Sequence, residues 1–475
     1  MNSSKLRAAR DHVARWHVAN WRVVNWVLLA TFVVTAAAAP TLSRAQEVGK
    51  NPLTPEYLIG DAVSLSNQTY PDIEKAIQRF SNKDAQGAQE YLDKAKEKYP
   101  KLPPTEVMMA KMQILNRNAR AVQYYLERAA TLHPEDPESY LMLADRAFQS
   151  QRTAESLSLF EYAAPLVEKF SENSKRKRNF SIRVLAGRAA VAERRGQWER
   201  ARDLLQQWID IDPDNALAHT RLGIVLFRLE QAKESLAEFT KARDINPDAA
   251  HPYVSLGQLF YANGDQERAR KSFEKAYNEN KTDGKVAQSY AEWLIQLHEL
   301  DKAQEIATAL RQQSPDSLTA LLLDGIVAYM QEQSDRAEQT LQKVLSLDPR
   351  NARATDLMAL LLIQSDKVED KERALQYAQN NAERLKNSAQ ANVTRAYVLY
   401  ELGRKAEAQK SLAQAGKMQI QPDSTFLIAK ILIKENQNDK AIDALRKIVN
   451  QKSGLVIFRR KAEELLKELQ DQVAP

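Results

Sequence analysis

The chain has no cysteine and few of the residues that interrupt helices. Its 475 residues include only 13 glycines and 17 prolines. The lack of cysteine excludes disulfides, thiolate metal sites and cysteine nucleophiles. The low glycine and proline content favours helix, while 44% hydrophobic and 27% charged residues are ordinary for a soluble folded protein.

Recognisable catalytic and metal-binding motifs are also lacking. The six histidines include no pair at metal-ligand spacing, and the glycines form no phosphate-binding loop and no Gly-x-Ser-x-Gly. His219 and His251 could approach each other across adjacent repeats, but a histidine with satisfied hydrogen bonds is the simpler interpretation. We therefore expect no enzymatic activity, no cofactor and no metal site.

Positive charge is concentrated at the N-terminus. The formal net charge is +6, and residues 1–45 carry +5 of it. The remainder of the chain is close to neutral, so it has no extended basic surface for a nucleic acid. We expect a protein or peptide partner and no nucleic acid.

Residues 1–45 have the pattern of a targeting segment. A basic start leads into the apolar stretch from Val27 to Ala39, and Ser43-Arg44-Ala45 precedes Gln46, which is typical of a signal peptide cleaved after Ala45. An uncleaved anchor is the alternative, because the 20 residues from Val23 to Leu42 are mostly apolar and could span a membrane. Both predict an exported, periplasmic or cell-envelope protein with membrane contact only through this segment.

A 34-residue period organises the rest of the chain. Small residues recur at one position in each repeat, and only small side chains let two helices cross closely. Glycines 196, 264 and 403 mark a turn between two helices, and prolines end many of the repeats. The first small position holds Ala76, Ala110 and Ala144, then, after an 11-residue insertion, Ala189, Gly223, Gly257, Ala291, Gly325 and Ala359.

This pattern resembles the tetratricopeptide repeat family. The resemblance rests on the Leu-Gly pairs at 222–223 and 256–257, the small positions, the closing prolines, and aromatic residues such as Phe239 and Phe273. It implies an all-α fold of about eleven helix-turn-helix repeats stacked into a right-handed superhelix, an α-solenoid. The predicted starts of the repeats are residues 69, 103, 137, 182, 216, 250, 284, 318, 352, 389 and 423.

Interruptions of the period give the predicted organisation. Lys175 to Arg178 form a basic run that could bind phosphate or an acidic partner, although a solvated loop is the simpler interpretation. We assign residues 1–45 to the signal peptide or membrane anchor, 46–68 to a linker and possible capping helix, 69–170 to repeats one to three, 171–181 to the basic insertion, 182–454 to repeats four to eleven, and 455–475 to a C-terminal capping helix.

Aromatic residues late in the first helix of several repeats are the candidate binding residues. The resemblance implies that neighbouring positions line a concave face, although packing between helices is an alternative explanation for such a series. The hypothesis is a non-enzymatic protein–protein interaction scaffold of the cell envelope that binds a protein or peptide on this face. The alternative is an assembly factor in polysaccharide or outer-membrane export. The candidate partner-binding residues are Phe227, Tyr261, Tyr329, Tyr397 and Tyr400.

Overall fold

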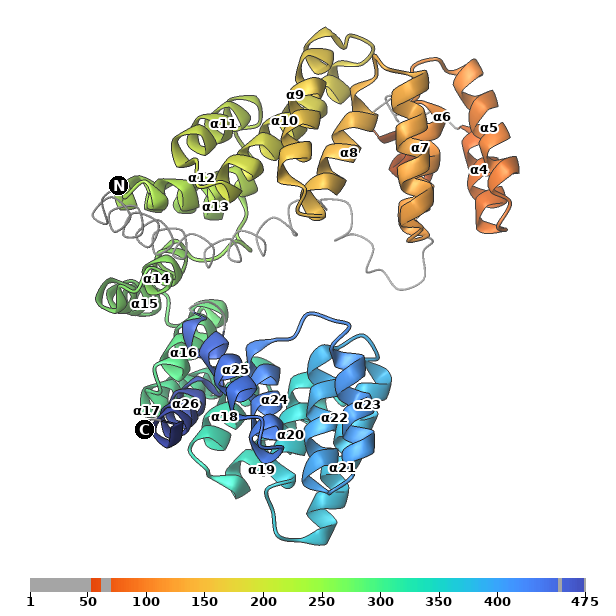
Figure 1. Ribbon diagram of the computed structural model, residues 1–475. Coiled ribbons are helices and arrows are strands. Elements are labelled where there is room, and N and C mark those ends of the chain that lie inside the picture. Colours follow the sequence, from red (N-terminus) through yellow and green to blue (C-terminus); the bar gives the residue numbers. More distant parts are fainter. Residues whose placement is uncertain (1–52, 61–69, 452–454, 474–475) are drawn as a thin grey trace, which may run out of the picture. The chain divides into compact units, whose positions relative to one another are not determined.

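The computed structural model describes residues 53–60, 70–451 and 455–473, and these residues form helices joined by short turns (Figure 1). The predicted signal peptide or anchor at 1–45 lies outside the described residues. None of the described helices combines the length and the hydrophobicity needed to cross a membrane.

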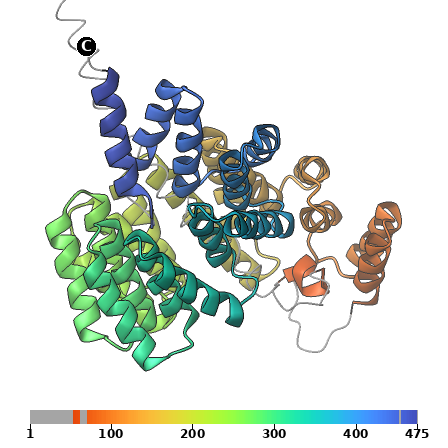
Figure 2. The same cartoon turned by 90° about the horizontal axis from the view of Figure 1, so that it is seen from below.

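Within the described residues, α4 to α25 form eleven successive helix-turn-helix pairs, which confirms the eleven predicted repeats. We call the first helix of each pair helix A and the second helix B. The chain divides into two compact units, an N-terminal unit that ends at Ala249 and a C-terminal unit that begins at Ala250. Figure 2 shows the helices of a pair lying side by side.

The N-terminal unit contains a short leading helix and five helix pairs. Its helices are α3 (Pro55–Ile59), α4 (Pro71–Ser81), α5 (Ala85–Lys98), α6 (Thr105–Leu115), α7 (Ala119–Leu132), α8 (Pro137–Gln149), α9 (Thr153–Lys169), α10 (Ser174–Arg194), α11 (Trp198–Ile211), α12 (Ala216–Arg228) and α13 (Ala232–Ile245).

The C-terminal unit contains six pairs and a final helix. Its helices are α14 (Pro252–Ala262), α15 (Gln266–Glu279), α16 (Gly284–Gln296), α17 (Leu300–Gln313), α18 (Leu318–Met330), α19 (Ser334–Leu347), α20 (Ala352–Leu362), α21 (Val368–Arg384), α22 (Ala389–Glu401), α23 (Lys405–Ala415), α24 (Pro422–Lys434), α25 (Asn438–Asn450) and α26 (Arg459–Val473).

Small residues let the two helices of a pair cross closely, as the period predicts. A Cβ atom added to Gly257 would lie 2.9 Å from ring carbons of Phe273 on the partner helix. A Cβ added to Gly223 would lie 2.7 Å from the ring of Phe239. Each glycine therefore provides the space that the aromatic ring of helix B fills.

The turn between helix A and helix B contains a residue in the left-handed conformation. Glycine occupies this position at Gly196 and Gly264, with φ of 68° and 86°. In other repeats the residue is not glycine, as at His298 and Glu332, with φ of 61° and 60°. A side chain makes this conformation unfavourable by about 1 kcal/mol or more. The packing of the repeat therefore imposes the turn even where the local sequence does not favour it.

The basic insertion is mostly helical, which corrects the interpretation of Lys175–Arg178 as a solvated loop. The side chain of Asn173 caps α10 by accepting a hydrogen bond of 2.9 Å from the backbone N–H of Arg176. The Arg176 side chain is only 5% exposed and pairs with Asp136 and Glu138 at 3.0 and 2.6 Å. Buried carboxylates hold this arginine inside the N-terminal unit, and the run is therefore part of the fold.

Candidate partner-binding surface

The A helices form the inner layer of the C-terminal unit. Successive A helices touch one another, α16 with α18, α18 with α20, α20 with α22, and α22 with α24. The B helices instead contact mainly the A helices on either side of them. A stack in which one layer is more closely spaced curves toward that layer, so the A helices lie on the concave side.

A segment from the end of the chain lies against this inner layer. We call residues Val456–Leu469 the returning segment. It begins with Val456, Ile457 and Phe458, which are at most 5% exposed. Figure 1 shows the helix that follows, α26, close to α16 and α18.

Phe458 is the main apolar anchor of the returning segment. Its ring stacks on Phe426 of α24, with centroids 4.8 Å apart and planes at 17°. The same ring meets Tyr329 of α18 edge to face, with centroids 6.2 Å apart. The backbone N–H of Phe458 donates to a carboxylate oxygen of Asp423 at 3.3 Å. Phe458 thus joins two A helices that belong to different repeats.

The first turn of α26 carries the contact toward other repeats. The guanidinium of Arg459 donates to the carbonyl oxygens of Val449, at 3.0 Å, and Gln451, which fixes the segment to the end of α25. Tyr261 of α14 lies within electrostatic range of Arg459 and Glu463, and burial raises the pKa of Tyr261. The returning segment therefore also lies near the end of α14.

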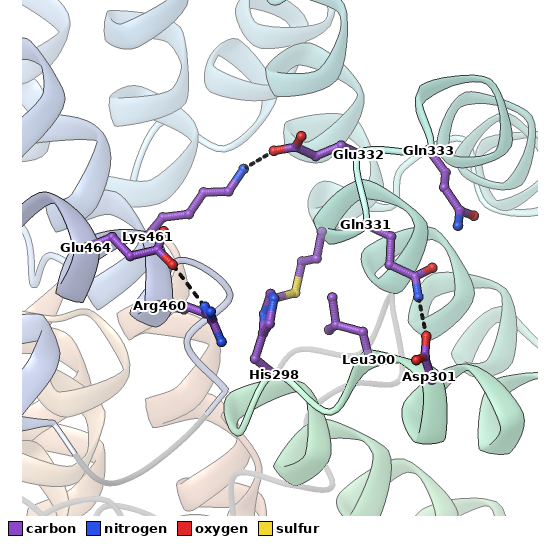
Figure 3. Close-up of a pocket in the computed structure, with 10 residues that line it drawn as sticks. His298, Leu300, Asp301, Gln331, Glu332, Gln333, Arg460, Lys461 and Glu464 are labelled. Atoms are coloured by element: carbon purple, nitrogen blue, oxygen red, sulfur yellow. Dashed lines mark hydrogen bonds and ion pairs between the residues drawn. The ribbon is translucent and has the colours of Figure 1, made fainter.

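A cleft of about 590 Å³ separates α26 from the turns at the ends of α16 and α18 (Figure 3). Arg460, Lys461 and Glu464 line it from α26. His298 and Glu332, which both have left-handed turn conformations, line the opposite side. Lys461 and Glu332 form an ion pair of 3.2 Å across the cleft, with side chains 47% and 77% exposed.

His298 is a polar group held at the edge of this cleft. Burial and the nearby positive charge of Arg460 lower the pKa of the imidazole, which favours its neutral form at pH 7. Within the described residues its Nδ1 atom has no hydrogen-bond partner. His298 therefore lines the cleft as a neutral imidazole with one buried, unpaired nitrogen.

The five predicted binding residues do not form one cluster. Tyr261 and Tyr329 lie at the returning segment, and burial raises the pKa of Tyr329 to about 12. Tyr400 is partly exposed and donates to Glu435 at 2.5 Å. Tyr397 is 5% exposed and accepts a hydrogen bond of 2.6 Å from Lys430, which favours the alternative of packing between helices for this residue. Phe227 is in the N-terminal unit and is 8% exposed, which favours a packing role.

Several residues of this surface carry no signal in the local sequence. His298, Glu332, Asp423 and Phe426 were not recognised, because they meet only when the repeats stack. Phe458 carried one local signal, since it ends the apolar run Leu455–Phe458 immediately before the charged α26. The predicted capping region at 455–475 contains α26 at Arg459–Val473, which packs on α25. The residue before this helix, Phe458, contacts the inner layer.

The described residues contain no group of three or more side chains suited to a metal ion. His219 is buried and fully paired, with Nδ1 2.6 Å from Glu238 and Nε2 2.9 Å from the carbonyl oxygen of Pro213. It is a packed histidine with satisfied hydrogen bonds, as expected, although it lies inside the unit.

Comparison with known families identifies repeats along most of the chain. A family model described as "Tetratricopeptide repeat" matches residues 115–170, 184–250 and 393–455. A second, described as "Cytochrome c-type biogenesis protein H TPR domain", matches residues 244–354.

Individual relatives are distant. Tetratricopeptide repeat protein 21B of Homo sapiens is 26% identical over 207 residues, which is 42% of this chain and 16% of that protein. The human mitochondrial import receptor subunit TOM70 is 24% identical over 168 residues, which is 34% of this chain and 28% of that protein. The chain thus spans less than a third of the length of these curated relatives.

Solved structures with similar folds include yeast Tom70, with 14% identity, a TM-score of 0.38, and coverage of 85% of this chain and 95% of that chain. The pilus biogenesis factor PilW aligns with 18% identity and a TM-score of 0.33, covering 42% of this chain and 91% of that chain.

Proposed function

Since the chain belongs to the tetratricopeptide repeat family, we propose that it is a non-enzymatic scaffold that binds a protein or peptide on the inner face of the C-terminal unit. One observation carries this proposal. The chain's own returning segment lies on that face and uses contacts that any polypeptide could make: an aromatic ring stacked on Phe426 and a backbone N–H donated to Asp423.

The chemistry of the face suits a polypeptide ligand. Aromatic rings bury large areas with little loss of side-chain freedom, and they often dominate binding energies. Tyr261, Tyr329 and Phe426 supply such rings from three different A helices. The carboxylate of Asp423 and the charged groups around the cleft supply polar contacts that can fix the orientation of a bound chain.

A site-specific photocrosslinker tests the proposal. A photoreactive amino acid replaces Tyr261 in the full chain, and the matched control places it at Tyr162 of α9, a tyrosine that is 53% exposed in the N-terminal unit. We expect one protein to crosslink at position 261 and not at position 162.

The crosslinked protein is then purified, and hydrogen exchange of the scaffold is measured with and without it. We expect slower exchange at the ends of α14, α16 and α18 and unchanged exchange in α15 and α17. Protection confined to B helices, or equal crosslinking at both positions, would contradict binding on the inner face.

We further propose that the chain acts outside the inner membrane, which rests on the pattern of residues 1–45. Sequencing the N-terminus of the native protein tests this assignment. Gln46 as the first residue indicates a cleaved signal peptide, whereas an intact start with recovery in the membrane fraction indicates an anchor. An intact start in the soluble fraction contradicts both.

A role in assembling an envelope component is the second candidate. The match of residues 244–354 to a repeat domain named for a cytochrome c-type biogenesis protein favours it. The identity of the protein crosslinked at position 261 separates the two, because an assembly factor should capture a component of the machine it helps to build.

A further inference from the structure

The surface proposed to bind a partner is already covered by part of the same chain. Phe458 fills the space between Tyr329 and Phe426, and α26 lies over the end of α16 at His298. A partner that used this surface would have to share it with the returning segment or displace that segment.

The packing of α26 on the inner layer is incomplete. Among residues 459–472 of the helix, whose burial the structure describes, Arg459, Ala462 and Leu469 are well buried, whereas Leu465 and Leu466 remain partly exposed. The 590 Å³ cleft separates the helix from the turns beneath it. A core helix would fill such a space, because protein interiors pack to nearly crystalline density.

The polar contacts of α26 are also those of a reversible interaction. Its ion pair with the inner layer, Lys461 with Glu332, is largely exposed, and exposed pairs contribute little stability. A detached helix of this length has only marginal stability in water. On the inner layer the segment therefore has one firm anchor, the region from Val456 to Arg459, whereas α26 itself packs mainly on α25 and is held only weakly by the A helices.

We propose that the returning segment is an internal ligand of the C-terminal unit, and that it yields the inner face to an amphipathic helix supplied by a partner. This inference rests on the proposed function and adds the chemistry of the partner. The partner helix is preceded by an aromatic residue for the space beside Phe426, and it carries a basic side chain where Lys461 faces Glu332.

The test uses a fluorescent synthetic peptide of residues 455–473 as the probe and measures its binding to the full chain by fluorescence anisotropy. The wild-type chain is compared with Phe458→Ala, which removes the anchor of the returning segment. Lys467→Ala, an exposed position on the same helix, is the matched control. We expect Phe458→Ala to bind the peptide at least tenfold more tightly than the wild type, and the control to equal the wild type.

A second variant protects the test against misfolding. Lys461→Glu places two carboxylates across the cleft and changes only exposed side chains, so the C-terminal unit should stay folded. It should bind the peptide about threefold more tightly than the wild type. Hydrogen exchange of residues 456–469 in each variant establishes that the segment is released.

A covalent lock gives the opposite perturbation. The chain has no cysteine, so Glu332→Cys combined with Lys461→Cys creates the only two reactive thiols. A short bismaleimide should join them and abolish peptide binding, whereas the unreacted double variant should bind at least as well as the wild type.

Three results would overturn the proposal. The first is equal affinity for the peptide in all variants. The second is a variant that does not bind the peptide although hydrogen exchange shows that its segment is released. The third is a peptide carrying Phe458→Ala that binds as well as the natural peptide. If the peptide test fails while a partner still protects α14, α16 and α18, the scaffold function stands without the internal ligand. If the peptide binds but no partner protects these helices, the scaffold function fails, the proposed displacement by a partner fails with it, and only the docking of the segment on its own chain remains.

Discussion

Replacing Arg176 should destabilise the N-terminal unit far more than replacing Arg178, although both belong to the same basic run. Arg176 is 5% exposed and pairs with Asp136 and Glu138, which are also almost completely buried. Arg178 is 50% exposed and pairs with Asp212 at 2.6 Å. The substitutions Arg176→Met and Arg178→Met therefore form a matched pair, because each removes one guanidinium and keeps a long apolar stem.

The magnitude follows from what each substitution leaves behind. Breaking a buried ion pair costs roughly 3–5 kcal/mol when the remaining charge stays buried. Lys111 still pairs with Glu138 at 2.7 Å, so the cost should lie near the lower end, at about 3 kcal/mol. The guanidinium also lies over the rings of Phe170 and Phe180, 5.2 and 5.0 Å from their centroids, and that attraction is lost as well. Arg178→Met should cost about 1 kcal/mol or less.

Native-state hydrogen exchange in α8 to α10 is the appropriate assay, because stacked repeats can unfold independently and need not follow a two-state transition. A loss of about 3 kcal/mol corresponds to roughly a hundredfold faster exchange, since each 1.4 kcal/mol is about tenfold. Exchange in Arg176→Met that stays within threefold of Arg178→Met would refute the reasoning. In that case the buried ion pairs would contribute no more than exposed ones.

Two further predictions concern the C-terminal unit. Gly257→Leu should destabilise α14 to α17 by about 1–3 kcal/mol, because Phe273 fills the space at Gly257. The control Gly284→Ala should not destabilise these helices, because no atom lies within 4 Å of the new Cβ. Equal melting temperatures of the two variants would contradict the assigned helix crossing. Burial raises the pKa of Asp356 to about 6, although Asn381 donates a hydrogen bond of 2.9 Å to its carboxyl group. The folded state therefore favours the protonated carboxyl. The stability that this preference contributes is fully present below about pH 4 and is lost as pH rises through 6. Asp356→Asn should remove up to about 3 kcal/mol of this pH dependence. The measurement is the free energy of unfolding of the wild type and of the variant, each at pH 4 and at pH 7. If the change between the two pH values is the same in both proteins, Asp356 titrates normally.

The repeats could be predicted from the sequence because the close helix crossing recurs at a fixed interval. Gly257 and Phe273 are 16 residues apart, and the contact between them needs only two adjacent helices. Both residues of a contact within one repeat lie in one short segment of the sequence, where their spacing can be recognised. The same reasoning places the turn residues, including His298, which occupies the position that glycine holds in other repeats.

Which residue of the basic run is buried could not be predicted in this way. Arg176 and Arg178 look equivalent in the sequence, but the carboxylate of Asp136, which pairs with Arg176, is 40 residues away. Which arginine turns inward depends on how α10 continues from its cap at Asn173 and on the stacking of α8 beside it. Neither follows from local composition.

The candidate surface was missed for a related reason. An amphipathic helix near the C-terminus could be predicted, but its docking site consists of helix ends from several repeats. Tyr329 and Phe426 are 97 positions apart in the sequence, and only the curvature of the C-terminal unit brings both to Phe458.

The returning segment also changes how the C-terminal unit can respond to a partner. In a repeat stack each repeat normally contacts only its neighbours, so curvature is the sum of small local angles. Phe458 is an exception, because it joins Tyr329 of α18 to Phe426 of α24, three repeats later. A ligand that displaces it must restore contact with both helices or leave their ends unlinked. This requirement favours a rigid helix with an aromatic anchor over a short flexible tail, because only the former can replace the link that it removes.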